Sequence, residues 1–263
     1  MKHVGSFISK MAVYGLACLV TSLITSVQAA DGFARVQTLR GKAQYSEGGE
    51  WKVLTVGKVL RQGAVIQTAA NSSVDLFLKD NGPVVRVTAD TILGLDKLFF
   101  EETGGEVVID TRLDLRNGRI LGNVKKMAAA SNYQVKIPTG TVGIRGTDYD
   151  ISTSGIVRVI TGAVRIQYTT TAGPQEVIVT AGNTFTPPTT PGGTGTVAPT
   201  SPQDAQNAQI EWIHVQEMVV RIDPSGNLPP PVIGPIIVTP IAPPAIEQPL
   251  SPTTGEPTGG GGR

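Results

Sequence analysis

Few residues in this chain have the types and spacing that catalysis or metal binding requires. The sequence contains two histidines, His3 and His214, and a single cysteine, Cys18. It has no Gly-x-Ser-x-Gly turn to carry a nucleophilic serine, and no Cys/His spacing of the kind that binds zinc. We therefore expect no histidine triad, no zinc site and no enzyme. Carboxylate pairs for glycoside hydrolysis can come from distant strands and stay open, although nothing in the sequence singles them out.

Two further patterns resemble binding motifs only superficially. Asp148 and Asp150 could offer oxygen ligands to Ca²⁺. Residues i and i+2 of a strand share one face, however, and paired acids there are usually only hydrated. The spacing of Gly140, Gly143 and Gly146 differs from the G-x-G-x-x-G that opens a helix in dinucleotide-binding folds. We expect no metal and no cofactor.

The most distinctive stretch is Ile137–Ile151. It places Arg145 beside the last of three glycines at three-residue spacing and then alternates along Thr147–Ile151. Glycine allows backbone angles that other residues avoid, so the stretch predicts a tight junction that joins an upstream β segment to a downstream one. For Arg145 we favour a partly buried guanidinium tied to neighbouring carbonyls or to Asp148. The alternative is an anchor for an anion or a partner.

The first 29 residues have the features of a signal peptide. Lys2 and Lys10 give a positive start, an apolar run follows, and Val27-Gln28-Ala29 is a small-x-small site that predicts cleavage after Ala29. An uncleaved membrane anchor is the alternative, but the apolar run is shorter than the roughly 20 residues that a spanning helix needs. We expect an exported protein in the periplasm, at the outer membrane or outside the cell, with no stable transmembrane segment in the mature chain.

Cleavage after Ala29 would leave a mature chain without cysteine and close to neutral. A lipoprotein site at Cys18 would need an aliphatic residue where Gly15 stands. Of the 22 basic and 21 acidic residues, cleavage removes only Lys2 and Lys10, which leaves 20 against 21 and a net charge of −1. A nucleic-acid-binding protein would need a basic balance. We expect neither nucleic-acid binding nor thiol chemistry.

Residues 30–186 read as an all-β body. Short apolar alternations are separated by turn signals about every ten residues, which is typical of many short strands. Asn117-Gly118 predicts a hairpin with a type I′ turn. Glycine also precedes strand-like segments at Gly41, Gly118 and Gly162. This loose recurrence fits stacked β turns, arranged either as a partly solenoid-like coil or as a sandwich.

The segments after the β body have different compositions. Residues 187–202 form a Thr/Pro/Gly linker, and residues 203–223 predict an amphipathic helix that Ser201 or Asp204 could cap. Its apolar stripe, which includes Trp212, Val215 and Val219, would pack back on the β body. Contact with a partner or a membrane surface is the alternative. Residues 224–263 are a Pro/Gly-rich tail that we expect to be disordered.

The central stretch resembles the hallmark of FecR-type domains. The residues that carry the resemblance are Thr139, Gly140, Gly143, Ile144, Arg145, Gly146 and Thr147, in a run of the form I-R-G-T followed by an alternating strand. Supporting matches are Trp51-Lys52-Val53-Leu54, Ile66-Gln67-Thr68 and Asn117-Gly118-Arg119-Ile120. The resemblance covers roughly residues 34–186 and implies an all-β, partly solenoid-like envelope domain.

The resemblance also implies a role in interactions. The regulators that name the family receive a signal from an outer-membrane receptor, and they carry a cytoplasmic anti-sigma segment and a transmembrane helix ahead of the domain. In this sequence at most ten residues precede the apolar run, so sigma-factor control by this chain itself is not expected. We expect a non-catalytic envelope module that docks an envelope protein or a surface glycan and that could take part in signal sensing. The alternative is a structural protein that self-associates through Trp212 and its stripe.

Overall fold

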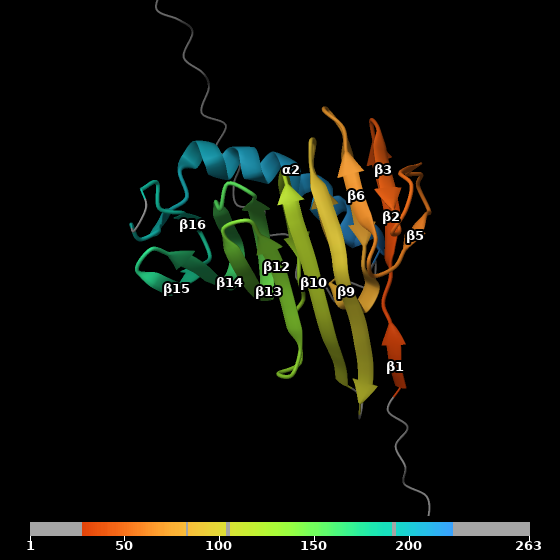
Figure 1. Cartoon of the computed structure of the whole chain (residues 1–263), viewed down its shortest axis with the longest axis horizontal. Coiled ribbons are helices and arrows are strands. Elements are labelled where there is room, and N and C mark those ends of the chain that lie inside the picture. The colour runs from red at the N-terminus through yellow and green to blue at the C-terminus, as the bar shows by residue number, and fades with distance from the viewer. Residues whose placement is uncertain (1–27, 83, 104–105, 191–192, 223–263) are drawn as a thin grey trace, which may run out of the picture. The chain divides into compact units, whose positions relative to one another are not determined.

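The computed structural model describes residues 28–82, 84–103, 106–190 and 193–222, which form a curled β-sheet of two facing layers and one helix (Figure 1). The first layer, here layer A, contains these strands: β1 (Gln28–Asp31), β3 (Ala43–Ser46), β4 (Lys52–Val53), β6 (Val65–Thr68), β9 (Ile92–Thr103), β10 (Glu106–Asn117), β12 (Asn132–Ile137) and β15 (Gly173–Thr180). Layer B contains β2 (Ala34–Arg40), β5 (Val59–Leu60), β7 (Ser73–Phe77), β8 (Val84–Val87), β11 (Arg119–Asn123), β16 (Asn183–Thr186) and β17 (Thr196–Pro199). A 3₁₀ turn, η1 (Lys79–Asn81), lies between β7 and β8.

Two long strands, β13 (Gly140–Ser152) and β14 (Val157–Thr170), belong to both layers. The first part of β13 pairs with β12, whereas residues 148–152 pair with β11. Likewise, β14 pairs with β16 near its start and with β15 near its end. All strand pairs are antiparallel except β10 with β12. The two layers therefore merge through β13 and β14 into one curled sheet, which confirms the prediction of an all-β body.

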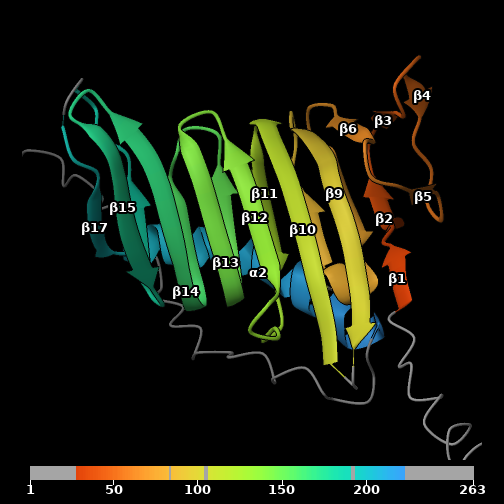
Figure 2. The ribbon, with the colours of Figure 1, turned by 60° about the horizontal axis from the view of Figure 1, so that its bottom comes forward.

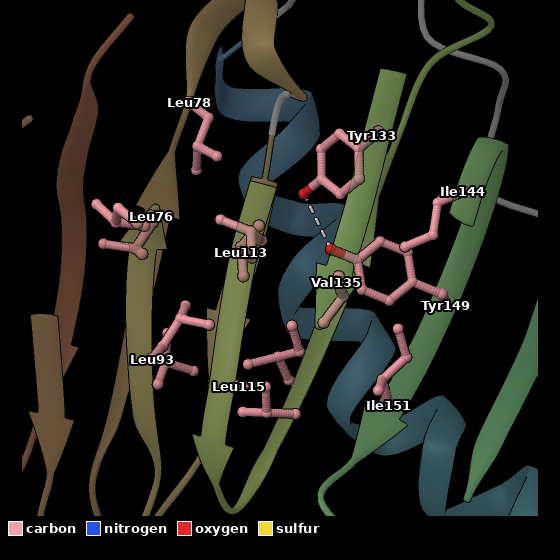
Figure 3. Close-up of a cluster of buried hydrophobic side chains, with 14 of the residues drawn as sticks. Leu76, Leu78, Leu93, Leu113, Leu115, Tyr133, Val135, Ile144, Tyr149 and Ile151 are labelled. Carbon is pink, nitrogen blue, oxygen red and sulfur yellow. Dashed lines mark hydrogen bonds between the residues drawn. The ribbon is translucent and has the colours of Figure 1, made fainter. Parts of the chain in front are cut away.

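The main core lies between the two layers. Along β10, Leu113 and Leu115 are buried while Asp114 and Arg116 point the other way, as the two-residue period of a strand requires. Tyr133 and Tyr149 meet across the core with their hydroxyl oxygens 3.1 Å apart. Figure 3 shows this pair among the neighbouring aliphatic side chains, which are Leu76, Leu78, Leu93, Leu113, Leu115, Val135, Ile144 and Ile151.

The glycines that recur in the sequence stand at corners between the layers. Gly41 links β2 to β3, Gly118 links β10 to β11, and Gly162 lies where β14 passes from layer B to layer A; their φ angles are 77°, 86° and 77°. A Cβ on Gly162 would lie 2.3 Å from the carbonyl oxygen of Gly146. The hairpin prediction at Asn117-Gly118 is wrong. Here β10 pairs with β9 and β12, whereas β11 pairs with β8 and β13.

The helix predicted after the β body is present as α2 (Pro202–Ile222). Ser201 caps it, because its Oγ accepts a hydrogen bond from the backbone N–H of Asp204 at 3.1 Å and donates one to the Asp204 carboxylate at 2.7 Å. The helix packs on β8 and β11 of layer B, on the side away from the main core. Within the predicted linker 187–202, residues 196–199 form β17 and pair with β16, so that part is a strand. Residues 1–27 of the predicted signal peptide (residues 1–29) and the tail 224–263 lie outside the described residues, whereas Gln28 and Ala29 belong to β1.

Candidate functional site

The central stretch forms a bend in β13. The pairing with β14 shifts between Arg145 and Asp148, and Gly146 at the bend has a φ of 62°. Thr147 is buried, and its hydroxyl donates a hydrogen bond to the carbonyl of Ala163 at 2.7 Å. Its backbone N–H and C=O both pair with Val124, at 2.9 and 3.0 Å. Gly146 and Thr147 therefore fix the point at which the chain crosses from layer A to layer B, as the predicted junction requires.

The other residues of the stretch hold β13 against its neighbours. Thr139 lies in the exposed turn between β12 and β13. A Cβ on Gly140 would lie 2.1 Å from the carbonyl oxygen of Gln167, so the backbones meet closely there. Ile144 is buried in the main core, whereas Gly143 faces outward between Gln134 and Arg165.

Arg145 does not take the position that we expected. Its side chain is exposed, and no hydrogen bond or ion pair joins its guanidinium to another described residue. The carboxylate of Asp148 instead accepts hydrogen bonds from the amide of Asn123 and, at 2.8 Å, from the hydroxyl of Thr161. The prediction of a partly buried arginine tied to Asp148 is therefore wrong. Arg145 lies within β13 just before the bend. The alternation of side chains along the strand directs it to the outer face of layer A.

A row of charged residues crosses the outer face of layer B beneath α2. Asp150 is 1% exposed and accepts two hydrogen bonds from Arg119, at 2.7 and 2.8 Å. Arg158 lies 3.4 Å from the same carboxylate and 3.2 Å from Asp204 of the helix. The two arginines compensate the burial of Asp150, and one of them continues the network into α2.

A second charged group lies farther along the same face. Arg86 is 3.2 Å from Asp75, and both side chains are nearly inaccessible to solvent. The Nε of Arg86 also lies 3.1 Å from Glu211 of α2. Burial raises the pKa of Asp75, although the Thr38 hydroxyl and the Arg86 charge act in the opposite direction. The sequence did not reveal this row, because only the strand register places residues from β7, β8, β11, β13 and β14 side by side.

The apolar stripe of α2 packs between these charged groups. Trp212 is 4% exposed and Val215 is fully buried, and both contact Val84 and Leu121. The prediction that the stripe packs back on the β body is therefore confirmed for these two residues. The side chain of Val219 lies outside the described residues. A partner role for Trp212 and Val215 would require α2 to leave layer B, and it stays a prediction.

A cavity of about 720 Å³ lies beside the central stretch. Pro138, Thr139 and Thr141 line one side, and Tyr168 and Phe185 line another. The two aromatic rings pack against each other with centroids 5.3 Å apart, and the Tyr168 hydroxyl accepts a hydrogen bond from the backbone N–H of Gly195 at 3.0 Å. The opening is rich in threonine hydroxyls and carries one charged side chain, Lys136.

The described residues contain no group of three His, Cys, Asp or Glu side chains that could hold a metal ion. His214 is half-buried on α2, and its Nδ1 lies 4.0 Å from a carboxylate oxygen of Glu217. Asp148 and Asp150 each have separate hydrogen-bond partners, as described above. Across the described part of the chain, no helix has the length and apolar character that crossing a membrane requires.

Comparisons with known proteins give a family for the central part of the chain. No curated protein matches the sequence. Two crystal structures of a candidate anti-sigma factor from Parabacteroides distasonis ATCC 8503, at 1.65 and 2.50 Å resolution, are similar with a TM-score of 0.42 and 15% identity. The similarity covers 54% of this chain and 62% of that one. The family model described as FecR protein matches residues 64–165. These residues include the bend of β13 with Arg145, Gly146 and Thr147, so this central part of the chain is similar to FecR-type domains.

Proposed function

We propose that this protein is an exported, non-catalytic module of the cell envelope that docks an envelope component and serves in signal sensing. The match of residues 64–165 to the FecR family carries this proposal, because the regulators that name the family act by binding other proteins. The signal-like sequence of residues 1–29 supports export.

The way in which α2 is held supports a binding role. It docks through a small apolar cluster and through two ion pairs to layer B, Arg158–Asp204 and Arg86–Glu211. Both acids are more than one third exposed, so water can compete for these contacts. A helix held by so few contacts is one of the less stable parts of a fold. Binding of a partner could therefore release it or fix it in place.

Two experiments test the proposal. Fractionation of cells that express a C-terminally tagged chain should place the protein in the envelope or the medium, and replacement of Lys2 and Lys10 by glutamate should retain it in the cytoplasm. Crosslinking in intact cells, followed by mass spectrometry, should recover a component of the envelope. A cytoplasmic wild-type protein, or an envelope protein that captures nothing but itself, would refute the proposal.

A self-associating structural protein is the second candidate, and the free edge of layer A favours it. The last strand of that layer, β15, pairs with β14 alone and carries Val177, Ile178 and Val179 without an intervening charge. Ile178 is 57% exposed. Unprotected edge strands readily pair with other chains. Light scattering should show oligomers of the wild-type protein and monomers of the Ile178→Lys variant. If the wild-type protein is monomeric at all concentrations, this candidate is rejected.

A further inference from the structure

The outer face of layer A carries basic residues on four neighbouring strands. Arg112, Lys136, Arg145 and Arg165 stand on the four neighbouring strands β10, β12, β13 and β14. We call these four residues the basic strip. Figure 2 shows these strands side by side, with α2 on the far side of the sheet. The strip therefore lies on the opposite side of the sheet from the helix.

The strand register places these side chains on one face. Arg112 is opposite Gln134, Gln134 is opposite Gly143, and Gly143 is opposite Arg165. Lys136 and Arg145 are two residues away from Gln134 and Gly143 along their own strands, so they share this face. The alternate residues Val135, Val142, Ile144 and Val164 are buried in the core. The side chains of the strip consequently point into solvent.

Acidic neighbours offset part of the positive charge of the strip. Residues 132–145 and 163–170 contain no acidic residue. Arg112, Lys136 and Arg165 are 55%, 66% and 60% exposed, and they lie 3.3, 3.8 and 3.2 Å from Asp110 and Asp114 of β10 and Glu176 of β15, respectively. Arg145 has no ion-pair partner among the described residues. Water competes for ion pairs whose basic side chains are this exposed, so the carboxylates of a ligand can compete for the same cations.

We propose that the basic strip binds an acidic polysaccharide whose carboxylates contact the arginines. This inference rests on the proposed function and names the chemical class of the envelope component. Guanidinium groups bind carboxylates with two parallel hydrogen bonds. Neighbouring strands lie about 4.8 Å apart, which is of the same order as the repeat of an extended sugar chain. Arg112 and Arg165 lie in one cross-strand row with Gln134 and Gly143, and Lys136 and Arg145 flank this row on opposite sides. A polysaccharide that follows the row could therefore place carboxylates near basic residues at both ends and on both sides of it.

The polar residues between the basic ones fit a glycan better than a protein. Gln134, Thr141 and Gln167 face the same side and offer amide and hydroxyl groups to sugar hydroxyls. Gly143 leaves room between Gln134 and Arg165, because a Cβ there would have no atom nearer than 3.6 Å. Protein interfaces usually depend on aromatic or large aliphatic anchors at their centre. Beside the strip, the exposed aliphatic residue Ile178 is opposite Arg165 on the edge strand β15, not at the centre of the face.

Isothermal titration with oligogalacturonate, which carries one carboxylate on each sugar, tests the proposal. The strip variant is Lys136→Gln/Arg145→Gln/Arg165→Gln. The matched control is Arg40→Gln/Lys42→Gln/Lys52→Gln, which removes the same charge at exposed positions outside the strip. Affinity should fall by about tenfold or more in the strip variant, since charge-assisted hydrogen bonds are lost, and should change by less than about twofold in the control. Dextran, which is neutral, should not bind to the wild-type protein.

Three results would overturn the proposal. They are absence of oligogalacturonate binding, an equal loss in both variants, and tighter binding of poly-glutamate, which would indicate an acidic protein partner instead. Equal melting temperatures of the three proteins would show that the fold is intact. Crosslinking of the wild-type chain in cells tests the proposed function separately. If the strip variant still captures the same envelope component, the basic strip is not the binding surface, and the proposed function stands.

Discussion

Removal of the Trp212 indole should detach α2 without unfolding the β-sheet. The side chain is 4% exposed and packs on Val84, Leu121 and Val215. Its indole N–H has no hydrogen-bond partner among the described residues, so Trp212→Ala removes apolar contacts only. Such a truncation in a packed cluster costs about 3–5 kcal/mol. A loss of about 3 kcal/mol would raise the population of the undocked helix by more than roughly 100-fold. An isolated helix of this length is only marginally stable in water, so the undocked segment should also unravel.

Hydrogen exchange measured by mass spectrometry separates this result from general destabilisation. In Trp212→Ala the amides of α2 should exchange much faster, whereas those of β9, β10 and β13 should keep most of their protection. Ile210→Ala is the control, because Ile210 is on the same helix and is 62% exposed; it should leave exchange in α2 nearly unchanged. Unchanged protection of α2 in Trp212→Ala, or an equal loss throughout the sheet, would refute our view that this helix is docked through the Trp212 cluster as a separable unit.

Three further predictions concern the sheet itself. Gly162→Ala should lower the melting temperature clearly more than Gly182→Ala. Both glycines have a φ of 77°, but a Cβ at Gly162 would lie 2.3 Å from the Gly146 oxygen, whereas nothing lies within 4 Å of one at Gly182; equal losses would contradict the tight corner. Asp150→Ala should lower the free energy of unfolding by about 3–5 kcal/mol, because it leaves Arg119 and Arg158 without their shared carboxylate. Glu176→Ala, which breaks an exposed pair with Arg165, should cost no more than about 1 kcal/mol, and similar costs in urea titrations would count against the buried network. Burial raises the pKa of both Tyr133 and Tyr149, so above pH 10 the unfolded chain binds fewer protons than the folded one. Stability should then fall by about 1.4 kcal/mol per pH unit for each tyrosine, and Tyr133→Phe should make the decline less steep; the same slope in both proteins would argue against the buried pair.

Much of the fold could be predicted because it follows from local patterns. Alternation of apolar residues gave the strands, and Ser201 with the spacing of Trp212 and Val215 gave the capped amphipathic helix. The recurring glycines at positions 41, 118 and 162 marked corners, since each needs a positive φ that other residues avoid. These signals depend on neighbours in sequence.

Features that depend on strand pairing could not be predicted. Asn117-Gly118 has the composition of a hairpin turn, but only Gly118 has a positive φ, and the flanking strands enter different layers. The burial of Arg145 could not be predicted because it depends on the position of the bend in β13. A shift of the strand by one residue moves each side chain to the other face of the sheet. The charged row beneath α2 and the basic strip both combine residues from strands that are distant in sequence. Their members look like ordinary surface charges until the register is known.

The central claim is that this FecR-like domain docks an envelope component, and site-specific crosslinking in living cells tests it most directly. A photoreactive amino acid at Gln167, which is exposed among the residues of the basic strip, should yield a crosslinked product that contains an envelope component. The same group at Thr55, which is exposed near β4 outside the strip, should not yield that product. An envelope product from Gln167 alone is the result that our account predicts. If neither position captures anything, the basic strip is not the docking surface. If crosslinking of the whole chain also recovers only further copies of it, the claim that the domain is an envelope-docking module is contradicted.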